Sequence, residues 1–241
     1  LYNLSVITGS PGTGKTTVLK IILEVYRRLY PDRKIVLMAP TGRASRRMAE
    51  STGFDKACTL HSELGLVSEE DEGSRSRKKD GMDADMVIVD EFSMVDMWLA
   101  GRFFQALKKG AKIILVGDPD QLPSVGPGQV LEDLIASKAF PVVILKRIFR
   151  QAGESDIVVN AHRIQEGKSI ALDNKSKDFF FLERNDVNVI YKHIVQLVQD
   201  MLPRYVQASP ADIQVLTPMK KGSLGVEALN RALQQYLNPP E

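Results

Sequence analysis

The chain has 241 residues, of which 44% are hydrophobic, and its formal net charge is only +2. This composition suffices for a buried core in one large domain or two modest ones, and it argues against a disordered chain. The near balance of charge neither requires nor excludes nucleic acid, so any polyanion site would depend on local clusters. The single cysteine, Cys58, excludes an intramolecular disulfide, and no apolar run approaches the roughly 20 residues of a membrane span. We therefore expect a cytoplasmic location and no membrane partner.

Short apolar runs alternate with helix-like patterns through residues 1–145. The predicted strands are Leu4–Thr8, Lys34–Ala39, Met86–Val89, Lys112–Val116 and Val142–Leu145. The predicted helices are Thr16–Leu29, Ala44–Ser51, Asp96–Lys108 and Gly128–Ser137. This alternation predicts an α/β fold in which a parallel sheet is covered by helices on both faces. In such folds the functional loops gather at the carboxyl ends of the strands.

The rhythm restarts after Leu145, and we predict a domain boundary near Lys146, which divides the chain into residues 1–145 and 146–241. The predicted elements of the second part are helices at Asp156–Gln165, Val187–Met201 and Val226–Leu237, and strands at Phe179–Leu182 and Ile213–Thr217.

A glycine-rich loop, Gly9–Thr16, reads GSPGTGKT and lies between the first predicted strand and the first predicted helix. This order is typical of a loop whose backbone N–H groups surround a phosphate. We expect Lys15 to reach the β- and γ-phosphates of a nucleoside triphosphate and the Thr16 hydroxyl to ligate Mg²⁺. The predicted ATP-binding residues are Gly9, Pro11, Gly12, Thr13, Gly14, Lys15, Thr16 and Thr17. The alternative, a simple glycine-rich turn, fits poorly with the flanking strand and helix.

Two carboxylates, Asp90 and Glu91, end the apolar strand Met86–Val89. Successive side chains at a strand's end diverge, so one carboxylate can face a metal ion while the next addresses a water. We assign Asp90 to Mg²⁺ and Glu91 to activation of the attacking water. A surface acidic turn is the alternative for such a pair in isolation.

The segment Gly117–Pro123 reads GDPDQLP and also begins at the end of a predicted strand. Gln121 carries both a donor and an acceptor, which suits it to sense the γ-phosphate and its water. A proline-rich turn is the alternative.

These three segments, at these spacings, resemble motifs I, II and III of superfamily 1 helicases. Further segments resemble motif Ia, the next DNA-contacting motif and motif IV: Ala39–Ala44, Thr59–Ser62 and Ile148–Gln151. With Asp-Glu-Phe-Ser-Met at 90–94, the motifs are most similar to the RecD-like branch, whose members move 5′ to 3′ on single-stranded DNA. The resemblance extends from Leu4 to Pro240. It implies an ATP-dependent DNA helicase or translocase of repair or recombination, with a P-loop NTPase fold (RecA-like) followed by an incomplete second RecA-like domain.

The resemblance also implies roles for single residues. Arg150 would act as an arginine finger on the transferred phosphoryl group, beside Lys15, Asp90, Glu91 and Gln121. The predicted DNA-binding residues are Pro40, Thr41, Arg43, Thr59 and His61. Threonine hydroxyls and nearby N–H groups would hold phosphates without reading sequence. Arg46 and Arg47 lie on a predicted helix, where a solvated positive face is as plausible as DNA contact.

Residues 66–84 occupy the place of a small insertion, a hairpin that acts as a strand-separating pin in related helicases. Four acidic and four basic residues flank Gly73-Ser74, so the segment could fold back on itself, but it contains no aromatic wedge. We favour a solvated loop over a working pin.

Some parts of the family pattern are absent from this sequence. An upstream glutamine motif and motifs V and VI cannot be found, and the chain begins at Leu1 and not at Met. We therefore expect a piece of a longer protein that cannot unwind duplex DNA by itself. The expected partners of the parent are single-stranded DNA and, in some relatives, nuclease or helicase subunits of a recombination complex, in a bacterial cytoplasm near the nucleoid.

Two other function classes compete with this interpretation. A guanine-specific GTPase would need Asn-Lys-x-Asp, but Asn174–Asp178 reads NKSKD and misses it by one residue. A non-motor scaffold subunit that binds ATP within a recombination complex is the alternative to a motor.

Overall fold

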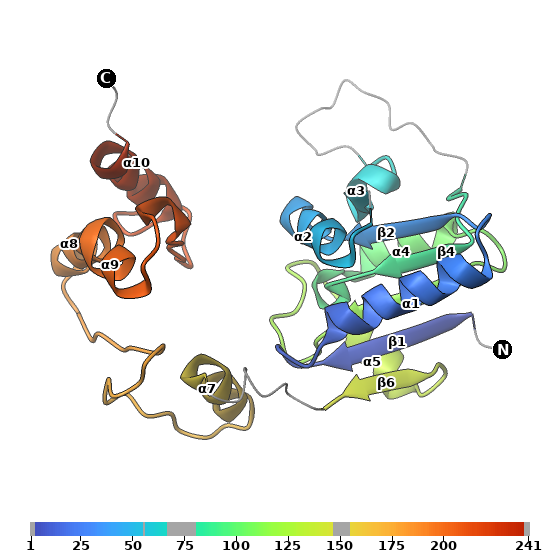
Figure 1. The fold of residues 1–241 in the computed structure, drawn as a ribbon, viewed down its shortest axis with the longest axis horizontal. Helices are drawn as coiled ribbons and strands as arrows, with labels where there is room; N and C mark the ends of the chain where they lie inside the picture. The colour runs from blue at the N-terminus through green and yellow to red at the C-terminus, as the bar shows by residue number, and fades with distance from the viewer. Residues whose placement is uncertain (1–2, 55, 67–80, 147–154, 239–241) are drawn as a thin grey trace. The chain divides into compact units, whose positions relative to one another are not determined.

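The computed structural model describes residues 3–54, 56–66, 81–146 and 155–238, and Figure 1 shows its fold. The chain divides into two compact units. The first contains residues up to Ala171 together with Ser176–Phe179, and the second contains Leu172–Lys175 and the residues from Phe180 onward. The domain boundary predicted near Lys146 stays a prediction.

The first unit is built on a six-stranded sheet with the order β3-β2-β4-β5-β1-β6, in which every pairing is parallel. The strands are β1 (Leu4–Gly9), β2 (Ile35–Ala39), β3 (Ala57–Thr59), β4 (Met86–Val89), β5 (Lys112–Gly117) and β6 (Val142–Leu145). This sheet confirms the predicted α/β fold of the P-loop NTPase class. Strand β3 has only three residues, and the sequence pattern did not predict it.

Helices and one 3₁₀ turn lie between the strands of the first unit, and a further helix follows the last strand (Figure 1). They are α1 (Lys15–Leu29), α2 (Gly42–Thr52), α3 (Leu60–Glu63), the 3₁₀ turn η1 (Phe92–Met94), α4 (Met97–Ala106), α5 (Val130–Ser137) and α7 (Asp156–Gln165). The five helices predicted in this part of the chain are all present, and none of their ends is shifted by more than two residues.

Two apolar cores lie on opposite faces of the sheet. Met86 and Ile88 of β4 pack in the cluster formed with α1 and α2. Val87 and Val89, which point the other way along the same strand, pack in the cluster formed with α4 and α5. All four residues of β4 are buried, as expected for a central parallel strand covered on both faces.

The second unit is helical within the described residues. Helix α8 (Val187–Gln196) continues through a π-helical turn, η2 (Leu197–Met201), into α9 (Leu202–Val206). A 3₁₀ turn, η3 (Pro210–Asp212), and α10 (Val226–Leu237) follow. The buried apolar residues of this unit are Val195, Val198, Leu229 and Ala232.

The two strands predicted in the second half are wrong, because in the described parts of the chain neither segment has a strand beside it. Both backbone groups of Phe181 bond instead to the Asn174 side chain, at 2.7 and 2.9 Å, and Phe180 packs edge-to-face on Tyr205. In 213–217, Leu216 is 86% exposed, unlike a sheet residue. The bonds made by Asn174 also give this side chain a structural role, which further weakens the guanine-reading alternative.

Candidate nucleotide-binding site

The glycine-rich loop leaves β1 and enters α1 with two residues in the left-handed region. Gly12 has φ 79° and Gly14, the N-cap of α1, has φ 83°, a conformation that favours glycine. The first intrahelical bond of α1 runs from the Val18 N–H to the Gly14 carbonyl, at 3.0 Å. The N–H groups of Lys15, Thr16 and Thr17 therefore have no partner within the helix and form an anion site at its N-terminus.

Gly9 packs too tightly for any other residue. A Cβ atom there would lie 2.6 Å from the Thr13 hydroxyl oxygen and 2.8 Å from the Leu145 carbonyl oxygen of β6. The start of the loop is thus held against a neighbouring strand.

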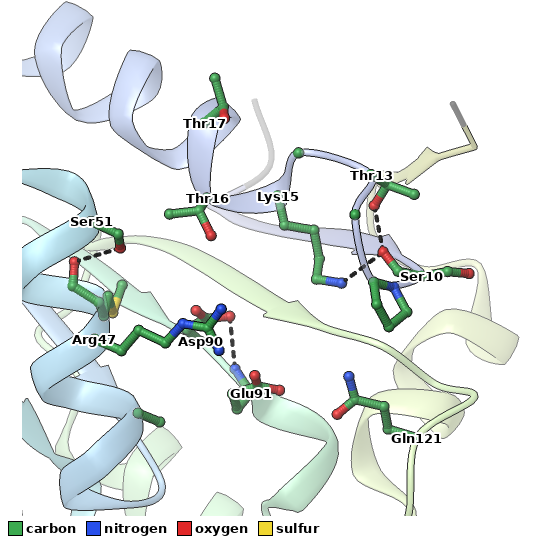
Figure 2. Close-up of a pocket in the computed structure, with 15 residues that line it drawn as sticks. Ser10, Thr13, Lys15, Thr16, Thr17, Arg47, Ser51, Asp90, Glu91 and Gln121 are labelled. Atoms are coloured by element: carbon green, nitrogen blue, oxygen red, sulfur yellow. Dashed lines mark hydrogen bonds between the residues drawn. The ribbon is translucent and has the colours of Figure 1, made fainter. Parts of the chain in front are cut away.

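The loop closes around Lys15, as Figure 2 shows. The Lys15 ammonium donates to the carbonyl oxygens of Gly9 and, at 3.3 Å, of Ser10. The Thr13 hydroxyl donates to the Ser10 carbonyl at 2.7 Å. These bonds hold the positive charge of Lys15 against the backbone carbonyls at the start of the loop.

A pocket of about 430 Å³ lies over this loop. It is lined by Pro11, Gly12, Thr13, Gly14, Lys15, Thr16 and Thr17, and by Asp90, Glu91 and Gln121 from the ends of β4 and β5. Gly9 lies behind the pocket and does not line it. The structure therefore brings together the predicted phosphate-binding and catalytic side chains of the first unit, while the role of each in catalysis stays a prediction.

Asp90 and Glu91 are fixed by their backbone. The Asp90 N–H donates to the Met38 carbonyl of β2 at 2.9 Å, and the Asp90 carboxylate accepts from the Glu91 N–H at 2.9 Å. Glu91 has φ 53°, which turns the chain into η1. Burial raises the pKa of Asp90, and the charges of Lys15 and Arg47 oppose that rise. Burial, followed by the Asp90 charge, raises the pKa of Glu91.

Asp118 organises the turn that carries Gln121. Its carboxylate accepts from the Asp120 N–H at 3.1 Å, and its carbonyl accepts from the Gln121 N–H at 3.2 Å. Only 1% of its surface is exposed. The sequence motif contains Asp118 but gave no indication of this role.

One face of α2 completes the pocket, which the sequence motifs did not predict. Ala44, Arg47, Met48 and Ser51 follow the i, i+3, i+4, i+7 spacing of a single helix face and all line it. Arg47 was predicted to lie on a solvated or DNA-facing surface, whereas its side chain extends toward Asp90 and Glu91 (Figure 2).

The predicted DNA-binding residues lie at the carboxyl ends of β2 and β3. These strands pair with Ala39 opposite Thr59, so Pro40 and Thr41 lie beside the start of α3. Thr41 caps α2 by accepting from the Ala44 N–H at 3.2 Å, and Thr59 caps α3 by accepting from the Ser62 N–H at 3.1 Å.

Both threonine hydroxyls remain able to donate, because capping uses only their lone pairs. Arg43 and His61 are exposed on the first turns of α2 and α3. The structure thus collects these residues at one edge, while their contact with DNA stays a prediction.

The residues present fit Mg²⁺. Among the described residues no group of three or more His, Cys, Asp or Glu could hold a metal, but Mg²⁺ at triphosphate sites needs only one or two carboxylates besides phosphates and waters. The Thr16 hydroxyl and the Asp90 carboxylate line the same pocket and supply such oxygens.

Two predicted features lie outside the described residues: Arg150, and most of the insertion proposed at 66–84. In the parts of the chain that the structure describes, no helix is both long and apolar enough to cross a membrane.

A family model described as an AAA domain matches residues 2–127, which include the loop, Asp90, Glu91 and Gln121. The chain belongs to this AAA domain family. One relative is the ATP-dependent RecD2 DNA helicase of Deinococcus radiodurans. The two sequences are 35% identical over 240 residues, and the match covers 100% of this chain and 31% of the relative.

The RecBCD enzyme subunit RecD of Mycolicibacterium smegmatis is 29% identical over 265 residues, covering 97% of this chain and 48% of the relative. These matches confirm the resemblance to the RecD-like branch. The chain spans less than half the length of either relative. Among solved structures, the Pif1 helicase from Candida albicans shares the fold, with a TM-score of 0.53 and 24% identity, over 80% of this chain and 51% of that one.

Proposed function

We propose that this AAA domain chain carries the nucleotide site of an ATP-dependent DNA helicase or translocase that moves 5′ to 3′ on single-stranded DNA. The observation that carries the proposal is the single pocket in which Lys15 and Thr16 face Asp90, Glu91 and Gln121. The similarity to RecD-like relatives, one of which is named an ATP-dependent DNA helicase, supports the substrate and the reaction.

Lys15, Thr16, Asp90, Glu91 and Gln121 of this pocket have roles in the proposed hydrolysis of ATP. The free N–H groups of α1 and the Lys15 ammonium hold the β- and γ-phosphates. The Glu91 carboxylate orients a water and accepts its proton, for which a raised pKa suits it. Mg²⁺, held by Thr16 and Asp90, would offset the charge on the phosphate oxygens. Gln121 reports the state of the γ-phosphate from the end of β5. Arg150 belongs to the proposal as the arginine finger.

On the DNA side, Pro40, Thr41, Arg43, Thr59 and His61 would hold the sugar-phosphate backbone at the edge formed by β2 and β3. Contacts to phosphates fix the position of a strand without reading its sequence, which suits a translocase. The proposal includes work on bacterial chromosomal DNA in a cytoplasm, at the nucleoid.

The deciding experiment measures ATP hydrolysis by the chain and by its full-length parent, with and without single-stranded oligonucleotides. We expect stimulation by DNA in the parent and its loss in Lys15→Ala. Displacement of streptavidin from the 3′ end, but not from the 5′ end, of a biotinylated oligonucleotide would show movement toward 3′. A rate of ATP hydrolysis that is the same with and without DNA would contradict the proposed motor activity.

A second candidate is an ATP-binding scaffold within a recombination complex. The match to a protein named a subunit of the RecBCD enzyme favours a parent that assembles with other subunits. A scaffold would bind ATP without hydrolysing it faster in the presence of DNA, so the same assay separates the two.

A further inference from the structure

Helix α2 presents one side chain with five hydrogen-bond donors to the nucleotide pocket. Arg47 lies on the face formed with Ala44, Met48 and Ser51, and that face lines the pocket. Arg46, one residue earlier, points away by about 100° because successive helical residues are offset by that angle, and it does not line the pocket.

The Arg47 side chain is available to bind a ligand. Its residue is exposed, and among the described residues no hydrogen bond or ion pair holds its guanidinium. Figure 2 shows the side chain extended toward Asp90 and Glu91, and its charge opposes the rise in the pKa of both carboxyls. Among the described residues no ion pair joins Arg47 to either carboxylate, so its donors remain available to a ligand.

The pocket therefore contains two cations from different elements. Lys15 is the first residue of α1, and Arg47 extends from α2 toward Asp90 and Glu91. A water activated by Glu91 must attack the γ-phosphate, so a donor beside Glu91 is near the terminal phosphate. The planar fork of a guanidinium matches two phosphate oxygens at once.

We propose that Arg47 is a second phosphate-binding residue of this pocket, which donates to the terminal phosphate of bound ATP. This inference rests on the proposed function and deepens it. It assigns to α2, the helix that Thr41 caps and whose first turn carries Arg43, a direct contact with the γ-phosphate.

The test is equilibrium binding of Mg²⁺ with a fluorescent non-hydrolysable ATP analogue, and with fluorescent ADP, to the 241-residue chain. Arg47→Met should weaken binding of the triphosphate about tenfold or more, the value of one hydrogen bond to a charged group, and binding of ADP by less than about twofold. Arg46→Met is the matched control and should change neither. Arg47→Lys, which keeps the charge but loses the fork, should fall between.

Two results would overturn the inference. In the first, Arg47→Met binds each nucleotide as tightly as the unsubstituted chain does. In the second, Arg47→Met loses the same affinity for ADP as for the triphosphate. Lys15→Ala separates this failure from a failure of the proposed function. If Lys15→Ala weakens binding while Arg47→Met does not, only the Arg47 assignment is wrong. If Lys15→Ala has no effect either, the nucleotide site itself is wrong. Unchanged thermal melting of each variant shows that it folds.

Discussion

At the scale of single residues, Glu91 is the side chain on which the proposed chemistry depends. It is held in the left-handed region at φ 53°, which costs a residue with a side chain about 1 kcal/mol or more. The bond from its N–H to Asp90 and the turn of η1 fix this conformation. A carboxylate held in a strained but defined position fits a group that must orient a water.

We predict that Glu91→Gln keeps nucleotide binding and loses turnover. Glutamine has nearly the same shape but cannot accept a proton, so kcat should fall by about 10²- to 10⁴-fold. Steady-state hydrolysis and nucleotide binding should be measured on the same preparation. Glu50→Gln, on α2 but outside the pocket, is the control. Normal hydrolysis by Glu91→Gln would show that another group activates the water.

The motifs located the pocket, but the predictions omitted Ser10 and the face of α2, both of which line it. Lys15, Asp90, Glu91 and Gln121 each follow a strand or its loop, so their convergence could be expected from a parallel sheet. The direction of Arg47 could not, because it depends on how the helix after β2 is rotated against the sheet. The pocket-lining face of α2 mixes small, charged and apolar residues, a pattern that gives no periodic cue.

At the scale of elements, Gly9 packs closely against β6, whereas Gly101 of α4 has open space around it, so the two glycines should respond differently to substitution. Gly9→Ala should destabilise the fold by about 1–3 kcal/mol, since its Cβ would lie 2.8 Å from the backbone oxygen of Leu145. Gly101→Ala, in the middle of α4 with no atom within 4 Å of its Cβ, should instead stabilise by about 0.5–1 kcal/mol. Urea unfolding of both variants checks this. A neutral Gly9→Ala would show that β6 does not constrain the loop.

A cluster of charged residues lies at the amino ends of β2 and β4, at the other end of the strands from the pocket. Asp85 accepts from the Lys34 N–H at 3.0 Å and pairs with Arg33 at 2.9 Å and Lys108 at 3.3 Å. The backbone hydrogen bond from Lys34, followed by the side-chain hydrogen bond from Arg33, lowers the pKa of Asp85 to about 2. The charged carboxylate therefore stabilises the folded chain.

Acid should remove this stabilisation in a defined window. The folded pKa of Asp85 is below its ordinary value, so its contribution is complete above about pH 4 and is lost as the pH falls toward about 2. Asp85→Asn should lower the urea concentration at the midpoint of unfolding at pH 7. It should also make this midpoint fall less steeply as the pH is lowered from about 4 to about 2. Asp32→Asn removes an exposed carboxylate from the turn next to Arg33 and serves as the control. An unchanged acid profile in Asp85→Asn would contradict the prediction.

The element predictions succeeded where an apolar run has a sheet to join. The five strands predicted in the first unit all pair with neighbours. The apolar runs at 179–182 and 213–217 resemble strands equally well by composition, but the described residues offer them no partner strand. A local sequence pattern does not show whether a partner strand is present. For the same reason the three-residue β3, which pairs with β2 and leads directly into α3, was not predicted.

At the scale of the whole molecule, the candidate DNA edge and the nucleotide pocket share one junction. The Asp90 N–H donates to the Met38 carbonyl near the end of β2, and Pro40 and Thr41 follow two and three residues later. Helix α2 begins at this junction and places Arg47 in the pocket. A shift of α2 on binding ATP would therefore move the residues that we propose to hold DNA. The alternation of strands and helices predicted a common edge, but the strand order that brings β2 beside β4 had to come from the structure.

The last prediction concerns DNA affinity. If the edge of β2 and β3 holds phosphates, binding of single-stranded oligonucleotides should be nearly independent of sequence and should weaken steeply with salt. Removal of one cation that binds a phosphate should reduce the slope of log K against log salt by about 0.7 for single strands, because one condensed counterion is no longer released. Arg43→Gln, in the first turn of α2, should show this change, whereas Arg28→Gln, in the last turn of α1, should leave the slope as it is. Titration of several oligonucleotide sequences at a series of salt concentrations, with the full-length parent, gives both quantities. Strong preference for one sequence with little effect of salt would instead indicate readout of base edges, which a motor that must pass over every sequence cannot depend on.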